Sequence, residues 1–469
     1  MNKLDAIKKY LINNTYTYIE IDNDKSVNKI YELLINNKEE ILENDIECLY
    51  YGVYYCINKN YDLMKKYYLM AIEKGNDNSM YNLGNYYQDI EKDYNLMKKY
   101  YLMAIEKGNS NAMNNLGYYY KNIEKDYDLM KKYYLLAIEK DDDDAMNNLA
   151  YYYQDVEQDY NLMKKYYLMA IENNNSYAMI FLGNYYRDIE KNYDLMEEYY
   201  LMAIEKGNSG AMNNLGYYYK NIGKDYDLME EYYLMAIKNN NSYAMLNLGY
   251  YYENIEKNYD EMKKYYLMAI NNGNIDAMYS LGNYYQHEEK DYNLMKKYYL
   301  IAIDNNNSDA MNNLGYYYQH VENNYDLMKK YYLMAIENNN SDAMLNLGYY
   351  YEKIEKNYDL LKKYYLMAIE KDNIKAMIFL GKYYEKEKDY KEAINIYEKL
   401  IELNNSEGYN LIMFIFNNIY KDYKKVIYYY EKAKENNIKI NYNEELIEKI
   451  RKKIIEEDLN LYEYLIQNI

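Results

Sequence analysis

The chain has 469 residues, of which 79 are Tyr and none is Pro or Trp, and 50% are hydrophobic. This apolar content excludes a globally disordered chain and is enough for a large core. The formal net charge of −19 argues against a nucleic-acid partner, because binding to a phosphate backbone requires a basic face.

Cysteine content and hydropathy predict the compartment. Cys48 and Cys56 are the only cysteines, too few for a disulfide framework, and they fit a reducing compartment or simple packing. The first residues lack the uninterrupted apolar segment of a signal peptide. The most apolar stretch, residues 411–416, is far too short to span a bilayer. We therefore expect a soluble, intracellular, cytoplasmic protein without membrane insertion.

Residues 1–50 form the first predicted segment, an N-terminal helical cap. Helices are expected at about residues 4–13 and 25–43, on either side of a short alternating stretch. Segments of this kind, which differ from the repeats that follow, typically close the end of a repeat array.

The central segment, residues 51–389, is predicted to be a repeat array. Ten copies of a sequence close to YDLMKKYYLMAIE, the first beginning at Tyr61, follow one another at a constant spacing of 33 residues. A spacing without slips over ten copies is typical of one supersecondary unit that is stacked repeatedly. The sequence therefore predicts an all-α fold, an α-solenoid of about ten 33-residue helix-turn-helix repeats with helical caps.

Each repeat contains two amphipathic helices. The first, at about residues 112–123, has an apolar stripe at helical spacing, formed by Ala112, Leu116, Tyr119, Tyr120 and Ile123. The second, at about residues 127–140, has an apolar face wide enough to contact two neighbours. An Asn or Ser ahead of Ala112 can cap the first helix, and Asp126 can cap the second.

Glycine has two different roles in the repeat. Where the second helix ends, the left-handed conformation is expected at Gly or Asn, namely Gly75, Gly108, Gly207, Gly273, Asn173, Asn239, Asn305 and Asn338. Gly117 and its equivalents lie in the middle of the first helix, where glycine costs about 1 kcal/mol relative to alanine. Because the single replacement is the small residue Ala150, we expect a close approach of the partner helix at this position.

These positions together resemble the Sel-one-like repeat (SLR) of the tetratricopeptide-like superfamily. The resemblance covers about residues 45–400, and the residues that carry it are Ala112, Leu116-Gly117, Tyr120, Asp126, Leu129-Met130, Tyr133-Tyr134 and Ala137-Ile138. Two departures are visible: the usual glycine-containing insert between the helices is missing, leaving NIEKD, and the family's Lys-Ala is Leu-Met. The Asn-, Tyr- and Lys-rich composition also resembles repeat proteins of giant DNA viruses of amoebae, which implies location in the host cytoplasm.

Residues 390–469 form the third predicted segment, which consists of tetratricopeptide-like helices and a cap. The sequence around its start, KDYKEAINIYEKLIELN at residues 388–404, looks like a standard tetratricopeptide helix, and three or four further helices are expected. Because no Pro-, Gly- or Ser-rich linker divides the chain, the sequence favours a continuous stack.

A catalytic or metal site requires unlike groups that occur once, and the sequence contains few. His287 and His320 occupy equivalent positions in successive repeats, too far apart to share a metal ion. The aspartates at 141–144 lack the ligand spacing of a calcium loop and fit a capping turn. Residues 197–198 and 230–231 are Glu pairs in place of Lys pairs and predict an acidic patch on the outer surface. With no nucleotide-binding or hydrolase motif, we expect no enzyme, no cofactor and no metal.

Two positions of the first helix, those of Asn114 and Tyr118, vary between copies. The resemblance implies that they line the concave groove of the solenoid, and a groove of Tyr, Asn and Leu suits peptide binding. The candidate binding residues are Tyr81, Asn114, Tyr118, Asn147, Tyr151, Asn213, Tyr217, Leu246, Tyr250, Tyr279, Asn312, Tyr316, Leu345 and Tyr349. The alternative interpretation, that these are solvent-facing positions free to vary, is left open.

The sequence therefore predicts a protein–protein interaction scaffold or adaptor that holds a peptide or a partner helix in this groove. The resemblance implies such a role, since SLR proteins serve as adaptors in signalling, protein-quality and host–pathogen assemblies. A structural or self-assembling component, such as part of a virion, is the alternative. A hydrolase is a third hypothesis, and no unique polar constellation supports it.

Overall fold

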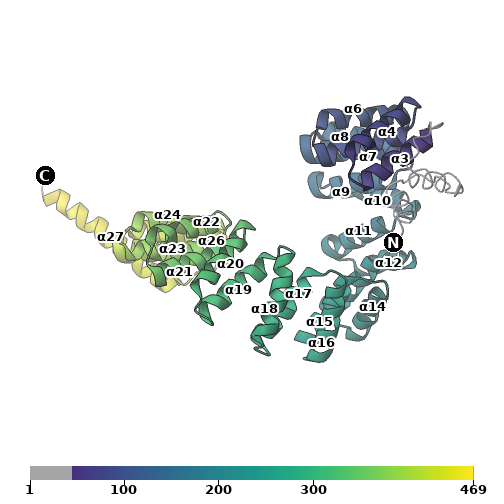
Figure 1. Cartoon of the computed structure of the whole chain (residues 1–469). Coiled ribbons are helices and arrows are strands. Elements are labelled where there is room, and N and C mark those ends of the chain that lie inside the picture. Colours follow the sequence, from purple (N-terminus) through teal and green to yellow (C-terminus); the bar gives the residue numbers. More distant parts are fainter. Residues whose placement is uncertain (1–44, 468–469) are drawn as a thin grey trace. The chain divides into compact units, whose positions relative to one another are not determined.

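The computed structural model describes residues 45–467, and their side chains as far as residue 456 (Figure 1). The helices expected at about residues 4–13 and 25–43, and with them most of the predicted cap, lie outside the described residues. The described residues form α-helices, π-helical turns and loops and contain no β-strand, which confirms the predicted all-α repeat fold. They divide into two compact units, Met1–Asn241 and Ser242–Ile469, called here the N-terminal and the C-terminal unit.

The described part of the N-terminal unit consists of helices that alternate as first and second helices of successive repeats. They are α3 (Asp45–Ile57), α4 (Tyr61–Glu73), α5 (Asp77–Tyr86), α6 (Tyr94–Glu106), α7 (Ser110–Tyr119), α8 (Tyr127–Ile138), α9 (Asp143–Tyr152), α10 (Tyr160–Glu172), α11 (Ser176–Tyr185), α12 (Tyr193–Glu205), α13 (Ser209–Tyr218) and α14 (Tyr226–Lys238). First helices continue into the π-helical turns η1 (Tyr87–Glu91), η2 (Tyr120–Glu124), η3 (Tyr153–Glu157), η4 (Tyr186–Glu190) and η5 (Tyr219–Gly223).

The C-terminal unit repeats the same alternation and ends in a longer helix. Its helices are α15 (Ser242–Asn254), α16 (Tyr259–Asn271), α17 (Ile275–His287), α18 (Tyr292–Asp304), α19 (Ser308–His320), α20 (Tyr325–Glu337), α21 (Ser341–Tyr350), α22 (Tyr358–Ile369), α23 (Ile374–Lys386), α24 (Tyr390–Glu402), α25 (Ser406–Ile415), α26 (Tyr423–Glu435) and α27 (Glu444–Gln467). Two π-helical turns, η6 (Tyr351–Glu355) and η7 (Phe416–Tyr420), occur in this unit.

Side-chain caps define where the two helices of a repeat begin. The Asn109 side chain accepts a hydrogen bond from the backbone N–H of Ala112 at 2.9 Å and starts α7. The Asp126 side chain accepts one from the N–H of Leu129 at 3.0 Å and starts α8, as predicted. Each cap satisfies a backbone donor that the first turn of a helix otherwise leaves unpaired.

The turn between the two helices reverses the chain without a glycine insert. The α-helix widens into the π-helical turn η2, and Lys125, in the left-handed conformation with φ of 58°, ends it. The N–H of Asp126 then donates to the carbonyl of Tyr120 at 3.0 Å. The wider turn shifts the helical phase, so Ile123 points outward and is 53% exposed. The prediction that Ile123 belongs to the apolar stripe is therefore wrong.

The turn between repeats also uses the left-handed conformation. Gly108 adopts it with φ of 88°, as the sequence predicts for a glycine that closes the second helix. In the repeats with asparagine the left-handed residue is Asn174, with φ of 62°, rather than Asn173. Asn173 caps α10 one residue earlier, so the predicted position was off by one.

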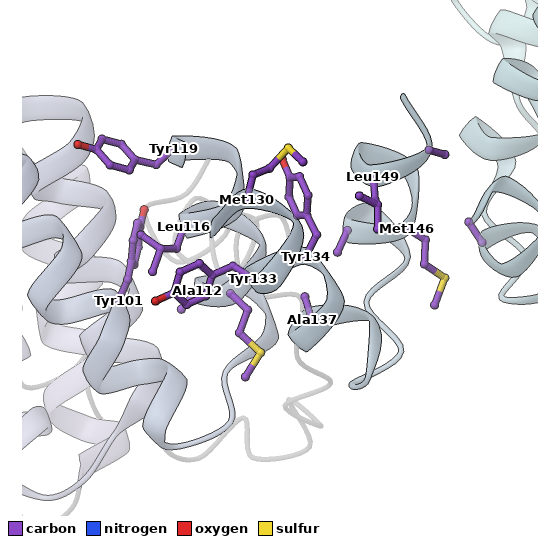
Figure 2. Packing of buried hydrophobic residues seen from close by; sticks show 14 of the residues in the cluster. Tyr101, Ala112, Leu116, Tyr119, Met130, Tyr133, Tyr134, Ala137, Met146 and Leu149 are labelled. Carbon is purple, nitrogen blue, oxygen red and sulfur yellow. The ribbon is translucent and has the colours of Figure 1, made fainter. Parts of the chain in front are cut away.

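Tyrosines fill much of the core, as Tyr101, Tyr119, Tyr133 and Tyr134 illustrate (Figure 2). The mid-helix glycine makes room for one of them. A Cβ atom added to Gly117 would lie 2.7 Å from Cδ1 of Tyr134, which is fully buried on α8. This contact confirms the predicted close approach of the partner helix. Tyr119 and Tyr120 are also buried, and the Tyr120 ring stacks on Tyr133 with centroids 5.6 Å apart.

Successive repeats are joined by a recurring ion pair on the second-helix side. Lys98 on α6 pairs with Glu124 in the next repeat at 2.7 Å, and the Tyr119 hydroxyl donates to the same carboxylate at 2.8 Å. In two repeats the charge is reversed, because Glu197 and Glu230 replace the lysine, and Glu197 accepts a hydrogen bond from the Tyr219 hydroxyl at 2.5 Å. Glu197 of the predicted acidic patch thus contributes to packing.

Candidate functional site

The predicted binding residues of the N-terminal unit lie in a row along its first helices. Tyr118, Tyr151 and Tyr217 are its exposed members, at 53%, 44% and 48% of their full accessible surface. The other members are half-buried or, in one case, buried: Tyr81, Asn114 and Asn213 are half-buried, and Asn147 is buried. The row therefore presents tyrosine faces to solvent.

The C-terminal unit carries the same row with fewer exposed members. Tyr316 and Tyr349 are exposed, whereas Tyr250, Tyr279 and Asn312 are half-buried. Leu246 and Leu345 are buried among core side chains. These two leucines offer little surface to a ligand.

A second row, of asparagines beside the first, was not identified from the sequence. Asn148 Nδ2 donates to Asn114 Oδ1 of the preceding repeat at 3.0 Å, and Asn346 does the same to Asn312 at 3.0 Å. Asn115 Nδ2 donates to the Tyr81 hydroxyl at 3.3 Å. These bonds fix the orientation of the amides that face solvent. The sequence signal was present, because this position is Asn in seven repeats, but the adjacent variable asparagine obscured it.

The two rows border a surface depression of about 430 Å³ in the N-terminal unit. It extends over α7, α9 and α11, and its lining residues are Gln88, Asn114, Asn115, Tyr118, Asp144, Asn147, Asn148, Tyr177 and Phe181. Three of the predicted binding residues, Asn114, Tyr118 and Asn147, thus come together in one place. Asp144, Tyr177 and Phe181 were not predicted: Asp144 and Tyr177 share a position that varies between repeats without an evident pattern, and Phe181 replaces an asparagine of the second row.

Two acceptor groups in this depression have no partner among the residues that the structure describes. Asn147 is only 8% exposed, and its Oδ1 atom accepts no hydrogen bond from the described residues. The Asp144 carboxylate forms no ion pair with any residue that the structure describes, and burial, reinforced by the neighbouring Asp143, raises its pKa. A buried acceptor without a donor is costly, which makes the depression receptive to a donor from outside.

The buried tyrosine opposite the mid-helix glycine differs between repeats in the partner of its hydroxyl. The Tyr101 hydroxyl donates to Asn85 Oδ1 at 2.6 Å. The hydroxyls of Tyr134, Tyr167 and Tyr233 have no hydrogen-bond partner among the described residues. In those three repeats the position of Asn85 is a tyrosine, which turns outward.

The difference between the hydroxyl partners follows a period of three repeats in the sequence. The position of Tyr118 carries Asn at every third repeat, namely at Asn85, Asn184 and Asn283. Pairs of tyrosines, all of them exposed except the half-buried Tyr250, are therefore separated at a fixed interval by an asparagine that serves the core. A comparison of every third repeat would have revealed this, whereas the 33-residue period alone conceals it.

Metal-binding and titratable groups are few on these faces. Among the described residues no group of three His, Cys, Asp or Glu side chains could hold a metal ion. The His320 ring packs on Tyr316 with centroids 4.2 Å apart, and burial lowers its pKa. In the aspartate run, Asp142 caps α9 by accepting from the N–H of Ala145 at 2.9 Å, which confirms the predicted capping turn.

The length and hydropathy of the helices decide whether any of them could cross a membrane. Within the part of the chain that the structure describes, no helix combines the length and apolar character needed to cross a bilayer.

Stacked helix pairs with a fixed repeat length define the chain as an all-α solenoid. A family model for the Sel1 repeat matches twelve segments of it: 47–76, 77–109, 110–142, 143–175, 176–208, 209–241, 242–274, 275–307, 308–340, 341–373, 374–405 and 417–438. The chain belongs to the Sel1 repeat family.

Several solved structures are similar to this chain. A protective antigen of uropathogenic Escherichia coli that displays an SLR fold is 22% identical over 91% of this chain and 97% of its own, with a TM-score of 0.42. A Sel1 repeat protein from Oxalobacter formigenes is 25% identical over 47% and 98%, with a TM-score of 0.39. Yeast Tom70 is 16% identical over 84% and 96%, with a TM-score of 0.38. No curated protein sequence matches the chain significantly.

Proposed function

We propose that this protein is an interaction scaffold that binds an extended peptide segment of a partner along its first-helix face. Sel1 repeats and tetratricopeptide-like repeats commonly form protein-interaction scaffolds. The observation that carries the proposal is the row of exposed tyrosines beside asparagines whose amides are fixed between repeats.

The chemistry of the two rows suits a peptide. Tyrosine offers a large, rigid apolar face with a polar tip and few rotatable bonds, so little entropy is lost on contact. Asparagine can donate to a backbone carbonyl and accept from a backbone N–H. Amides in a fixed orientation beside aromatic rings can therefore bind the main chain of a peptide, while neighbouring side-chain sites select the sequence of that peptide.

A set of tyrosine replacements tests this proposal. Replacement of Tyr217, Tyr250 and Tyr316 by Ala should abolish most enrichment of linear peptides from a displayed random library. Because Tyr217 and Tyr316 are exposed and Tyr250 is half-buried, circular dichroism should change little and the melting temperature should fall only slightly. The matched control replaces Tyr358 and Tyr428 by Ala, two exposed tyrosines of second helices, and should keep the enrichment.

Equal enrichment by the triple variant and the wild type would contradict the proposal. The self-assembly alternative makes a different prediction, an oligomer that forms with increasing concentration in light scattering, whereas a peptide-binding scaffold should remain at one mass over that range.

A further inference from the structure

We propose that the depression over α7, α9 and α11 is a subsite for an arginine side chain of a bound peptide. This inference rests on the proposed function and adds the chemistry of the partner, a basic segment with an arginine at the position that faces Asn147.

The hydrogen-bond acceptors that line the depression favour a ligand that donates hydrogen bonds. Asn147 Oδ1 is an unpartnered acceptor, and Asp144 is the only charged residue that lines the space. A guanidinium group carries five N–H donors and no acceptor, so it can donate to the amide oxygen and to the carboxylate together. A carboxylate or phosphate ligand would meet the same two groups with repulsion.

The aromatic residues of the depression suit the same group. Tyr118, Tyr177 and Phe181 all contribute to its lining, and Tyr177 is 63% exposed. Guanidinium groups stack on aromatic faces, where the ring quadrupole attracts the positive charge. A ring of the same row already does so with a cation of the chain itself, since the Lys121 ammonium lies 4.4 Å from the Tyr151 centroid.

The charge of the whole chain supports a basic ligand as well. The net charge of −19 attracts a basic segment at long range and increases its rate of association. The long-range attraction does not choose between arginine and lysine. The choice comes from the geometry of the subsite, because lysine is a point charge that can neither stack as a plane nor donate in a fork.

The equivalent surface of the C-terminal unit lacks these features, so the repeat alone does not produce them. Leu345 takes the position of Asn147, and Lys375 takes the position of Tyr177. Asp342, equivalent to Asp144, accepts a hydrogen bond from Asn373 at 3.2 Å. There the buried acceptor is missing, the carboxylate is engaged, and a lysine would repel an arginine.

Peptide titrations with the full-length chain test the assignment. The probe is a short labelled peptide of alternating Arg and Gly, compared with Lys–Gly and citrulline–Gly peptides of the same length. Asp144→Asn and Asn147→Leu should each weaken binding of the Arg peptide roughly tenfold, the loss expected when a hydrogen bond to a charged group is removed. The citrulline peptide, which keeps the shape and loses the charge, should bind at least about tenfold more weakly to the wild type.

The two variants are expected to fold, because the chain contains both replacements at equivalent positions, Asn111 and Leu246. Asp128→Asn is the matched control: it removes the same charge from the exposed side of α8, as Asn95 and Asn161 do in other repeats, and should leave the affinity unchanged.

Each of the other possible outcomes contradicts either the arginine assignment or the proposed function. If the Lys or the citrulline peptide binds as tightly as the Arg peptide, the arginine assignment is wrong, although peptide binding by this face stands. An equal loss of affinity in Asp128→Asn would show that binding depends only on the negative charge of the chain, which would also contradict the arginine assignment. If the wild type binds none of these peptides and selects none from a random library, the proposed function fails with it.

Discussion

The helices α7, α9 and α11 of the N-terminal unit and α19, α21 and α23 of the C-terminal unit are equivalent parts of the repeat array, six repeats apart. Their scaffolds agree closely. A Cβ atom on Gly117 or on Gly315 would lie 2.7 Å from the buried tyrosine opposite. The asparagine bonds between repeats, to Asn114 and to Asn312, are both 3.0 Å long.

Their surfaces differ at few positions. Seven of the nine residues that line the depression in the N-terminal unit are identical at the equivalent positions of the C-terminal unit. The exceptions are Asn147, which becomes Leu345, and Tyr177, which becomes Lys375. A single framework can therefore carry two different surfaces, and the difference in function that we propose comes from these two side chains and from the hydrogen bond that engages Asp342.

The largest expected effect concerns the shared scaffold. Gly117→Leu and Gly315→Leu should each destabilise the fold by about 3 kcal/mol, because the new side chain would overlap a fully buried tyrosine ring. The urea midpoint, followed by circular dichroism, should fall by the same amount in both variants. Gly117→Ala should cost less, since Ala150 shows that the fold accommodates a methyl group there. A clear difference between the two leucine variants would show that the scaffolds are not equivalent.

The second-largest expected effect is a change in stability that differs between the two surfaces. Leu345→Asn should cost about 2 kcal/mol, because it buries an amide and leaves a space in the core. Asn147→Leu should instead stabilise the fold by about 1 kcal/mol, since it removes an unpartnered acceptor. The free energies of unfolding should thus change in opposite directions. A loss of stability in Asn147→Leu would mean that the Asn147 amide is satisfied in the free protein.

A smaller effect concerns the tyrosine hydroxyls. Tyr118→Asn should stabilise the fold by about 1 kcal/mol, because it supplies Tyr134 with the acceptor that Asn85 gives Tyr101. Tyr316→Asn should bring no such gain, since the Tyr332 hydroxyl already donates to Gln319 at 2.9 Å. Thermal unfolding of both variants measures the difference. Equal changes would contradict the role assigned to the position of Asn85.

The smallest effect is a pH dependence. Burial raises the pKa of Asp142, the cap of α9, to about 6, whereas the equivalent cap in the C-terminal unit is Asn340. Because the folded-state pKa lies above the ordinary value of about 3.9, folding favours the protonated form, and Asp142 lowers stability as the pH rises from about 4 to about 6. Asp142→Asn should therefore stabilise the fold by about 1 kcal/mol at neutral pH, after allowance for solvent screening, and by almost nothing at about pH 4. Denaturation curves at the two pH values decide this, and a gain that does not depend on pH would contradict it.

The sequence predicted the scaffold well, because the scaffold depends on patterns that repeat. The 33-residue spacing, the cap at Asp126 and the close approach at Gly117 all follow from local rules that every repeat obeys. The outward rotation of Ile123 was missed, since a π-helical turn changes the helical phase without any proline or glycine to mark it.

The candidate site was predicted only in part, because it depends on departures from the pattern. Asn114, Tyr118 and Asn147 were identified as variable, but variability alone does not tell that Asn147 is buried without a donor. Asp144 lies on the same helix as Asn147, whereas Tyr118 and Tyr177 join them only through the stacking of neighbouring repeats. The sequence can show which positions are free to vary, and the structure shows which of them meet.

The most direct test of the central claim is to transfer the subsite. In the full-length chain, Asp144→Asn and Asn147→Leu would first disable the N-terminal depression, and Leu345→Asn with Lys375→Tyr would then complete the equivalent lining in the C-terminal unit. The account predicts that these two additional changes restore most of the affinity for the Arg–Gly peptide that the first two remove. An affinity that stays as low as in the disabled chain, with the fold intact by circular dichroism, would contradict it.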